Sequence, residues 1–118
     1  MALHRELSHS VDFALVYLEE AHPTDGWLYG SVTHFLPQPT TLAERCHAAT
    51  LLATELRKLD APSMPLCVDT MPNRASYAFG ALPERLVIVQ SGVVQFIGGK
   101  GPEQYSIAEA RDALQRLL

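Results

Sequence analysis

Glu20 and His22 are the two residues whose types and spacing best suit acid–base chemistry. They follow an apolar run at residues 11–18, and in extended backbone alternate side chains share a face. A carboxylate on the same face as an imidazole orients the ring and sets its protonation, so the pair could form a proton relay. The alternative is that neither residue is catalytic: Glu20 would be a solvated carboxylate at the end of a strand, and His22 an ordinary loop histidine. Tyr17 falls on the opposite face by simple alternation, so it would need a twist or bulge to join them.

The two cysteines, Cys46 and Cys67, are the only thiols of the chain. They form no CxxC pair and lie 21 positions apart, which favours reduced thiols over a zinc site or a disulfide framework. We expect both to be structural residues that are buried as small hydrophobes, Cys46 in a helix and Cys67 in an apolar strand. The residues therefore predict no metal site and no bound cofactor.

Composition limits the chain to a single domain of modest size, with 118 residues and about 13 kDa. Its net charge of −4, with scattered Lys and Arg, argues against a nucleic-acid partner. The longest apolar run, residues 13–18, is far shorter than the ~20 residues that span a bilayer. No secretion signal is visible, so we expect the chain as written to be cytoplasmic.

Hydrophobic periodicity, capping residues and turn residues predict a mixed α/β chain, whose helices and strands must position the candidate residues. Helices and strands are expected in the order α, β, loop, α, β, α, β, β, α, at residues 1–9, 11–18, 21–40, 41–59, 66–68, 74–79, 86–90, 93–97 and 106–118. The strongest signal is the hairpin around Ser91-Gly92, where glycine can adopt the positive φ of a tight turn. Thr41 and Ser106 each start a capping sequence with glutamate three residues later.

Two of these segments carry further expectations. The near-continuous apolar run at 11–18 predicts an interior strand buried on both faces. Residues 21–40 are rich in Gly and Pro and too long for an ordinary connection, so we expect a functional loop there.

One segment carries a family resemblance. Residues 17–27 read YLEEAHPTDGW and closely resemble the YIEEAHPSDGW segment of iodothyronine deiodinases. The resemblance continues through VDTM at 68–71, LPERL at 82–86 with its hairpin, and GGKGP at 98–102, and so covers nearly the whole chain. It implies a thioredoxin-like (peroxiredoxin-like) fold, a mixed sheet flanked by helices, for a single domain over 1–118.

The same resemblance implies that a strand is missing. In the family, a strand and turn that precede this region carry selenocysteine or cysteine, so the chain resembles an N-terminally truncated selenoprotein that lacks its central nucleophile strand. That strand would lie between the strands at 11–18 and 86–90. The gap leaves unpaired edges, so we expect a marginally stable chain that associates through them, for example as a homodimer. Direct pairing of the two flanking strands would instead close the gap.

The family's activity is the reductive removal of iodine from thyroid hormone. The resemblance implies an iodothyronine-like substrate and a thiol reductant as cosubstrate. It implies binding to a membrane only through an anchor segment that this chain lacks. A soft nucleophile attacks iodine and a proton reaches the leaving carbon, and the resemblance assigns this acid–base work to Glu20, His22 and Tyr17. Without the nucleophile, we expect no turnover from the chain alone.

The resemblance also implies substrate-binding residues. Trp27 would stack on an iodinated ring, although anchoring the loop is an equal alternative. Lys100 would pair with the hormone's carboxylate, or be a solvated turn lysine. Pro39 stands where the family has a histidine and can neither donate nor titrate, so His34 is the remaining candidate for the ring hydroxyl.

Two other functions stay open. The first is a natural nucleophile-free, thioredoxin-like module for binding or dimerisation. The second, a thiol peroxidase, is disfavoured because the AHPTDGW loop matches deiodinases and neither cysteine lies at the expected strand-to-helix turn.

Overall fold

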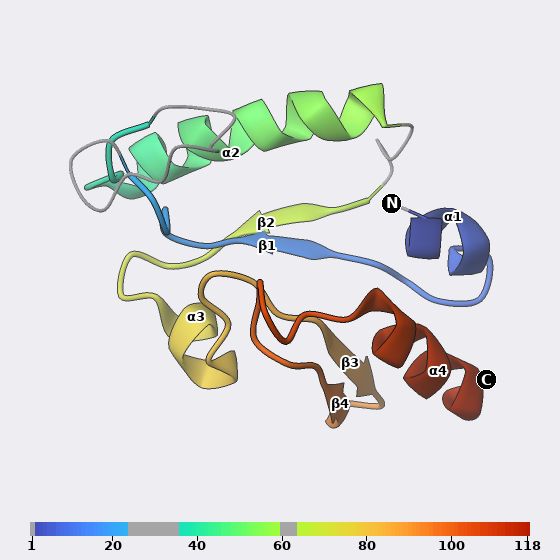
Figure 1. Cartoon of the computed structure of the whole chain (residues 1–118). Coiled ribbons are helices and arrows are strands. Elements are labelled where there is room, and N and C mark those ends of the chain that lie inside the picture. Colours follow the sequence, from blue (N-terminus) through green and yellow to red (C-terminus); the bar gives the residue numbers. More distant parts are fainter. Residues whose placement is uncertain (1, 24–35, 60–63) are drawn as a thin grey trace.

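The computed structural model describes residues 2–23, 36–59 and 64–118. In this part the chain is mixed α/β, and its helices and strands follow the predicted order (Figure 1). They are α1 Ala2–Leu7, β1 Leu15–Tyr17, α2 Leu42–Lys58, β2 Leu66–Val68, α3 Arg74–Phe79, β3 Val87–Gln90, β4 Val93–Ile97 and α4 Ile107–Leu117. Trp27 and His34 lie outside the described residues. No helix in the described part is long and apolar enough to cross a membrane.

Both predicted helix caps are confirmed. The Thr41 hydroxyl accepts a hydrogen bond from the backbone N–H of Glu44 at 3.1 Å, and Ser106 does the same for Glu109 at 3.2 Å. The Glu44 carboxylate accepts in return from the backbone N–H of Thr40 at 2.7 Å. Hydrogen bonds from the Thr40 backbone and then from its hydroxyl hold the pKa of Glu44 below its usual range. These bonds fix where α2 and α4 begin.

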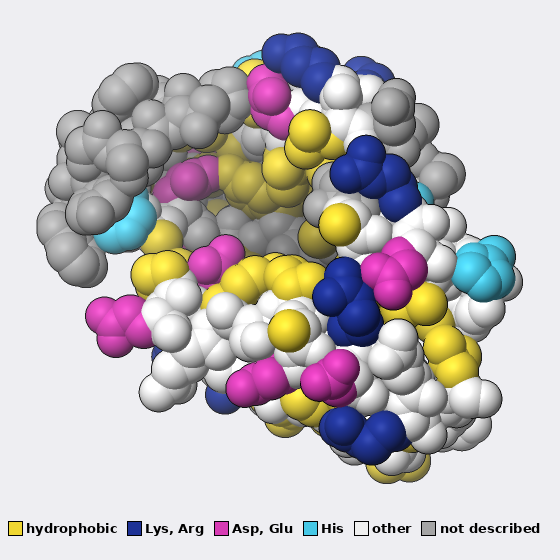
Figure 2. Space-filling view, turned by 45° about the vertical axis from the view of Figure 1, so that its right-hand side comes forward, with side chains coloured by type: hydrophobic (Ala, Val, Ile, Leu, Met, Phe, Trp, Pro, Cys, Tyr) yellow, Lys and Arg dark blue, Asp and Glu magenta, His cyan; other side chains and the backbone are white. Residues whose placement is uncertain are grey.

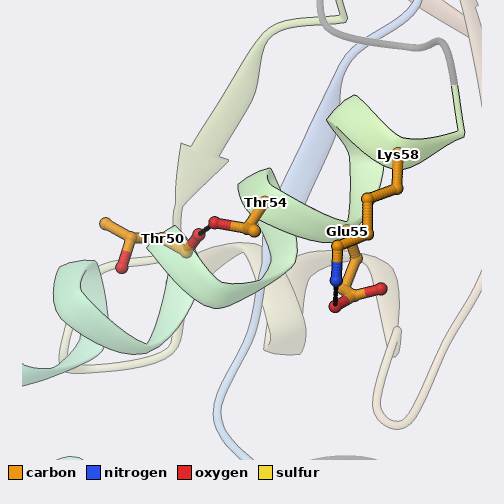
Figure 3. Close-up of polar contacts among 4 residues, drawn as sticks. All are labelled: Thr50, Thr54, Glu55 and Lys58. Carbon is orange, nitrogen blue, oxygen red and sulfur yellow. Dashed lines mark hydrogen bonds and ion pairs between the residues drawn. The ribbon is translucent and has the colours of Figure 1, made fainter.

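Helix α2 carries further polar contacts within its own turns (Figure 3). The Thr54 hydroxyl donates to the carbonyl of Thr50 at 3.1 Å, and Lys58 pairs with Glu55 at 3.1 Å. The Lys58–Glu55 pair, three residues apart, supports the helix from its own surface.

The core joins the two ends of the chain. Leu3 and Leu7 of α1 pack with Ala110 and Leu114 of α4 as one buried cluster. Ile107, the first residue of α4, is 37% exposed. Five half-buried hydrophobic residues pack against the cluster: Val11, Phe13, Leu86, Ile88 and Phe96.

Among the described residues, the strands form two separate two-stranded sheets. β1 pairs with β2 in parallel, and β3 pairs with β4 in antiparallel. The predicted hairpin turn is confirmed, with positive φ at Ser91 (52°) and Gly92 (76°). Such angles match the twist of a two-residue hairpin.

The strand predicted at 11–18 is shorter and more open than expected. Only Leu15–Tyr17 is a strand, and Val16 is 48% exposed. In the described part of the chain, β1 pairs with β2 alone, over the three residues from Leu15 to Tyr17. Cys67, opposite Val16 on β2, is also exposed. Cys46 is exposed on α2 as well, so the predicted burial of both cysteines is wrong.

The strands expected to flank the gap do not pair with each other. β1 and β3 belong to different sheets, so the alternative in which they close the gap directly is excluded. β3 runs roughly opposite to β1 below it in Figure 1.

Candidate functional site

A cavity of about 740 Å³ lies where β1 and β3 face each other. Its walls come mainly from residues 11–21 and 83–89. Residues of the described helices complete them, namely Leu3 from α1, Leu52 from α2, Phe79 from α3 and Leu114 from α4. Figure 2 shows a hollow on this side of the molecule with hydrophobic side chains lining it. The space is large enough for a small organic ligand.

Two of the predicted catalytic residues line this cavity. Tyr17, the last residue of β1, and Glu20 are both in its wall and both half-buried, whereas half-buried His22 does not line it. β1 ends before Glu20 and the chain bends at residues 21–22, so strand alternation does not relate the two side chains. The predicted relay between Glu20 and His22 stays a prediction.

Gln38 holds the backbone of Glu20 in place. The Glu20 N–H donates to Gln38 Oε1 at 2.8 Å, and Gln38 Nε2 donates to the Glu20 carbonyl at 2.8 Å. The side-chain amide thus bonds both backbone groups, as a neighbouring strand would. Sequence reasoning missed this residue, because the contact joins positions 18 apart and an exposed-looking Gln in a loop carries no local signal.

Asp69 anchors the segment after β2 next to Tyr17. Its carboxylate is 4% exposed and accepts from the backbone N–H groups of Thr70 (2.8 Å), Ala75 (2.9 Å) and Ser76 (2.9 Å). Its own N–H donates to the carbonyl of Tyr17 at 2.9 Å. Burial raises the pKa of Asp69, but these hydrogen bonds and the Arg45 charge outweigh it and lower the pKa below its usual value.

Arg45 is, after Gln38, another residue that the sequence analysis did not predict. It projects from α2, is 2% exposed, and donates from one guanidinium nitrogen to the carbonyls of Asp69 (3.3 Å) and Thr70 (2.7 Å). Asp directly after a strand and before a helix is a turn and cap signal that could have indicated Asp69. Nothing local marks Arg45, because a charged residue in an amphipathic helix usually faces water.

Lys100 is exposed and lies in a turn of fixed shape, away from the cavity lining. A Cβ at Gly99 would collide with the backbone of Gln104, and one at Gly101 would collide with the Glu84 side chain. The Gly101 N–H donates to the Glu84 carbonyl at 2.9 Å. The backbone contact at Gly99 therefore requires glycine there, whereas at Gly101 the Glu84 side chain would have to move.

The cavity lining contains carboxylates but no thiol. Asp12, Glu19, Glu20 and Glu84 line it, and neither cysteine does. Burial, and then the charge of Glu84, raises the pKa of Tyr105, which also lines it. In the described part of the chain, no group of three or more His, Cys, Asp or Glu side chains could hold a metal ion.

Comparison of the sequence with known protein families identifies the family of the chain. The sequence model of the family described as iodothyronine deiodinase matches residues 2–118. The chain belongs to this family. It is 43% identical over 106 residues to thyroxine 5-deiodinase of Bos taurus and 42% identical over 106 residues to that of Homo sapiens. It is 45% identical over 105 residues to that of Gallus gallus.

These deiodinases are much longer than the chain. The matched regions cover 90%, 90% and 89% of this sequence but only 34%, 33% and 39% of the Bos taurus, Homo sapiens and Gallus gallus proteins. The chain therefore spans little more than a third of the length of the curated deiodinases it matches. All six predicted site residues fall inside the region that the deiodinase family model matches.

Proposed function

We propose that this chain is the C-terminal part of a thioredoxin-like deiodinase domain that removes iodine reductively from an iodothyronine. In this proposal, the selenol or thiol nucleophile comes from a central strand outside the chain, so the chain alone has no turnover. Support comes from the family match over residues 2–118 together with one structural observation. Tyr17 and Glu20 line a cavity between β1 and β3, and the lining contains no cysteine.

The proposed reaction has two steps, and atoms and electrons balance in each. A selenolate or thiolate attacks iodine, the carbon–iodine bond breaks, and the ring carbon takes a proton, which leaves a selenenyl or sulfenyl iodide. Two equivalents of a thiol reductant then return the nucleophile to its reduced form and release iodide, a proton and one disulfide.

The chain's own residues would handle the proton and the substrate. Glu20 would orient His22 and Tyr17 would complete the proton path, with Gln38 holding the Glu20 backbone by its paired hydrogen bonds. Exposed Lys100 would attract the hormone's carboxylate as a point charge. Trp27 and His34 would contact the iodinated rings.

Iodide release tests this proposal. The purified chain with thyroxine and excess dithiol should release iodide at the blank rate. The chain joined behind the preceding segment of the Bos taurus deiodinase, with cysteine as the nucleophile, should release it measurably. In that fusion, His22→Asn should lower the rate at least tenfold, since general acid–base groups typically contribute about 10²–10⁴-fold.

The matched control in the fusion is His9→Asn, because His9 is exposed and lies outside the cavity lining. Iodide release by the bare chain above the blank would contradict the missing nucleophile. A folded fusion that releases none would contradict deiodination itself.

A second candidate function is a nucleophile-free binding module. The observation that favours it is the separation of β1 from β3, which leaves two strand edges facing one cavity. Unpaired edges readily bind other polypeptides by strand addition.

A further inference from the structure

Gly98, two residues before Lys100, is bonded through both of its backbone groups. Its N–H donates to the Leu86 carbonyl at 2.8 Å, and its carbonyl accepts from Arg85 Nε at 2.7 Å. Gly98 is buried, so water competes little for either bond. The turn that carries Lys100 therefore starts from a fixed point of the backbone, and one of the two bonds at that point comes from a side chain.

The guanidinium of Arg85 also holds the end of α3. Its Nη1 donates to the carbonyls of Phe79 (2.9 Å) and Gly80 (3.3 Å), which are the last residue of α3 and its C-cap. A Cβ on Gly80 would lie 3.1 Å from this nitrogen, and the φ of Gly80 is 56°, so glycine allows α3 to end close to the arginine. A lysine has one terminal nitrogen, whereas the planar guanidinium can donate in two directions at once. Arg85 thus joins the end of α3 to Gly98.

The turn that carries Lys100 borders the cavity between β1 and β3. Glu84 and Arg85 line the cavity, and so does Tyr105, which follows the turn. The Glu84 side chain also occupies the space that a Cβ on Gly101 would need. A ligand that fills the cavity would therefore have the turn at one side of it, where Lys100 is exposed.

We propose that Arg85 is a positioning residue that sets the affinity for carboxylate-bearing iodothyronines through Lys100. By holding Gly98, Arg85 limits the positions open to the Lys100 ammonium group, and it does so without touching the substrate. Two of the three guanidinium nitrogens already donate to backbone carbonyls. An exposed ion pair is weak when both partners must be ordered, so a backbone that is fixed beforehand strengthens it. This inference rests on the proposed function, because it takes Lys100 to meet the hormone's carboxylate.

Hydrogen exchange on the 118-residue chain tests whether Arg85 holds the turn. Arg85→Met keeps the aliphatic part of the side chain and removes its donors. It should speed exchange of the Gly98 and Gly101 N–H groups about tenfold, with changes below about twofold in α4. The matched control is Arg74→Met, which removes an exposed arginine of α3 and should leave both N–H groups unchanged. Unchanged exchange in Arg85→Met would overturn the proposal.

Kinetics of the fusion described above test the effect on the substrate. Thyroxine is compared with the analogue in which hydrogen replaces the carboxylate. Arg85→Met and Lys100→Met should each raise KM for thyroxine about fivefold, the upper range for an exposed ion pair, and should change kcat less than about twofold. Neither should change KM for the analogue more than about twofold. Arg85→Lys keeps the charge but cannot bond both α3 and Gly98, so it should behave like Arg85→Met and replaces it if the methionine variant is unfolded.

The double variant separates positioning from direct contact. If Arg85 acts through Lys100, adding Arg85→Met to Lys100→Met should raise KM no further. Two results would overturn the proposal: effects that multiply, which would make Arg85 a substrate contact, and an equal rise in KM for the analogue, which would make it a general structural residue.

The same experiments distinguish this inference from the proposed function. A wild-type fusion that releases no iodide would contradict the proposed function, and this inference with it. A working fusion in which Arg85→Met leaves KM for thyroxine unchanged would contradict only this inference.

Discussion

The β3–β4 hairpin and the β1–β2 pair are held in different ways. In the hairpin, strands of four and five residues are joined by a two-residue turn, and the bonds connect positions close in sequence. In the β1–β2 region, three-residue strands depend on side chains far along the chain. Gln38 bonds Glu20 across 18 positions, and Arg45 bonds Asp69 and Thr70 across 24 and 25.

This difference shows what each region needs in order to form. The hairpin closes its ladder with its own turn, and Leu86, Ile88 and Phe96 pack it against the core cluster of α1 and α4. Within the described residues β1 pairs with β2 alone, and the segments that follow the two strands are held by the side chains of Gln38, Arg45 and Asp69. A region built on such contacts should lose much more stability when one of them is removed.

The largest expected effect is that of Asp69→Ala. The change leaves the N–H groups of Thr70, Ala75 and Ser76 without their acceptor and removes the carboxylate that offsets the buried Arg45 charge. Losing one partner of a buried charged network typically costs about 3–5 kcal/mol. Urea unfolding followed by circular dichroism should show this loss, or a variant that is unfolded without urea.

The matched control for that prediction is Asp112→Ala, because Asp112 is an exposed carboxylate on α4. It should change the free energy of unfolding by less than about 0.5 kcal/mol. Equal effects of the two variants would mean that long-range polar contacts do not hold the β1–β2 region.

A smaller effect should follow from pH. The pKa of Asp69 is lowered in the folded chain, so between the folded pKa and the ordinary value near 4 the unfolded chain binds more protons. The stabilisation is therefore complete above about pH 5 and is lost as the pH falls through the folded pKa. The difference in unfolding free energy between wild type and Asp69→Asn should shrink in that range. A difference that stays constant from pH 6 to pH 3 would contradict the assignment.

Local signals in the sequence predicted most of the fold. The capping sequences at Thr41 and Ser106 and the Ser91-Gly92 turn act between residues at most four apart, and each is present as predicted. The strand at 11–18 was predicted too long because an apolar run indicates burial but not how many of its residues pair with a neighbouring strand. The exposure of Cys67 was missed because an apolar strand sequence does not show which face of the β1–β2 pair is covered.

The candidate site was predictable only in part. The family segment indicated Tyr17 and Glu20, and both line the cavity. Gln38 and Arg45 could not be predicted, because their roles depend on which distant backbone groups the fold brings to them. Composition and periodicity carry no information on such pairs.

The hairpin should respond to a purely local change at Gly92. Its φ is 76°, and a Cβ there would meet nothing within 4 Å, so only the backbone conformation opposes a side chain. Gly92→Val should destabilise the chain by about 1–2 kcal/mol, less than Asp69→Ala. Gly92→Asn should cost less than Gly92→Val, because asparagine tolerates left-handed backbone. Thermal unfolding measures both, and equal costs would show that the turn conformation is not what limits the hairpin.

The smallest effect is expected where a contact is both local and solvated. Lys58 pairs with Glu55 at 3.1 Å within α2, and their side chains are 66% and 39% exposed. Lys58→Ala should change the free energy of unfolding by less than about 0.5 kcal/mol, since water screens the pair and both long side chains lose freedom when they form it. Urea unfolding should show a small difference at low salt that becomes smaller still at high salt. A loss well above that value would show that this local, solvated pair contributes more to the stability of α2 than exposed ion pairs usually do.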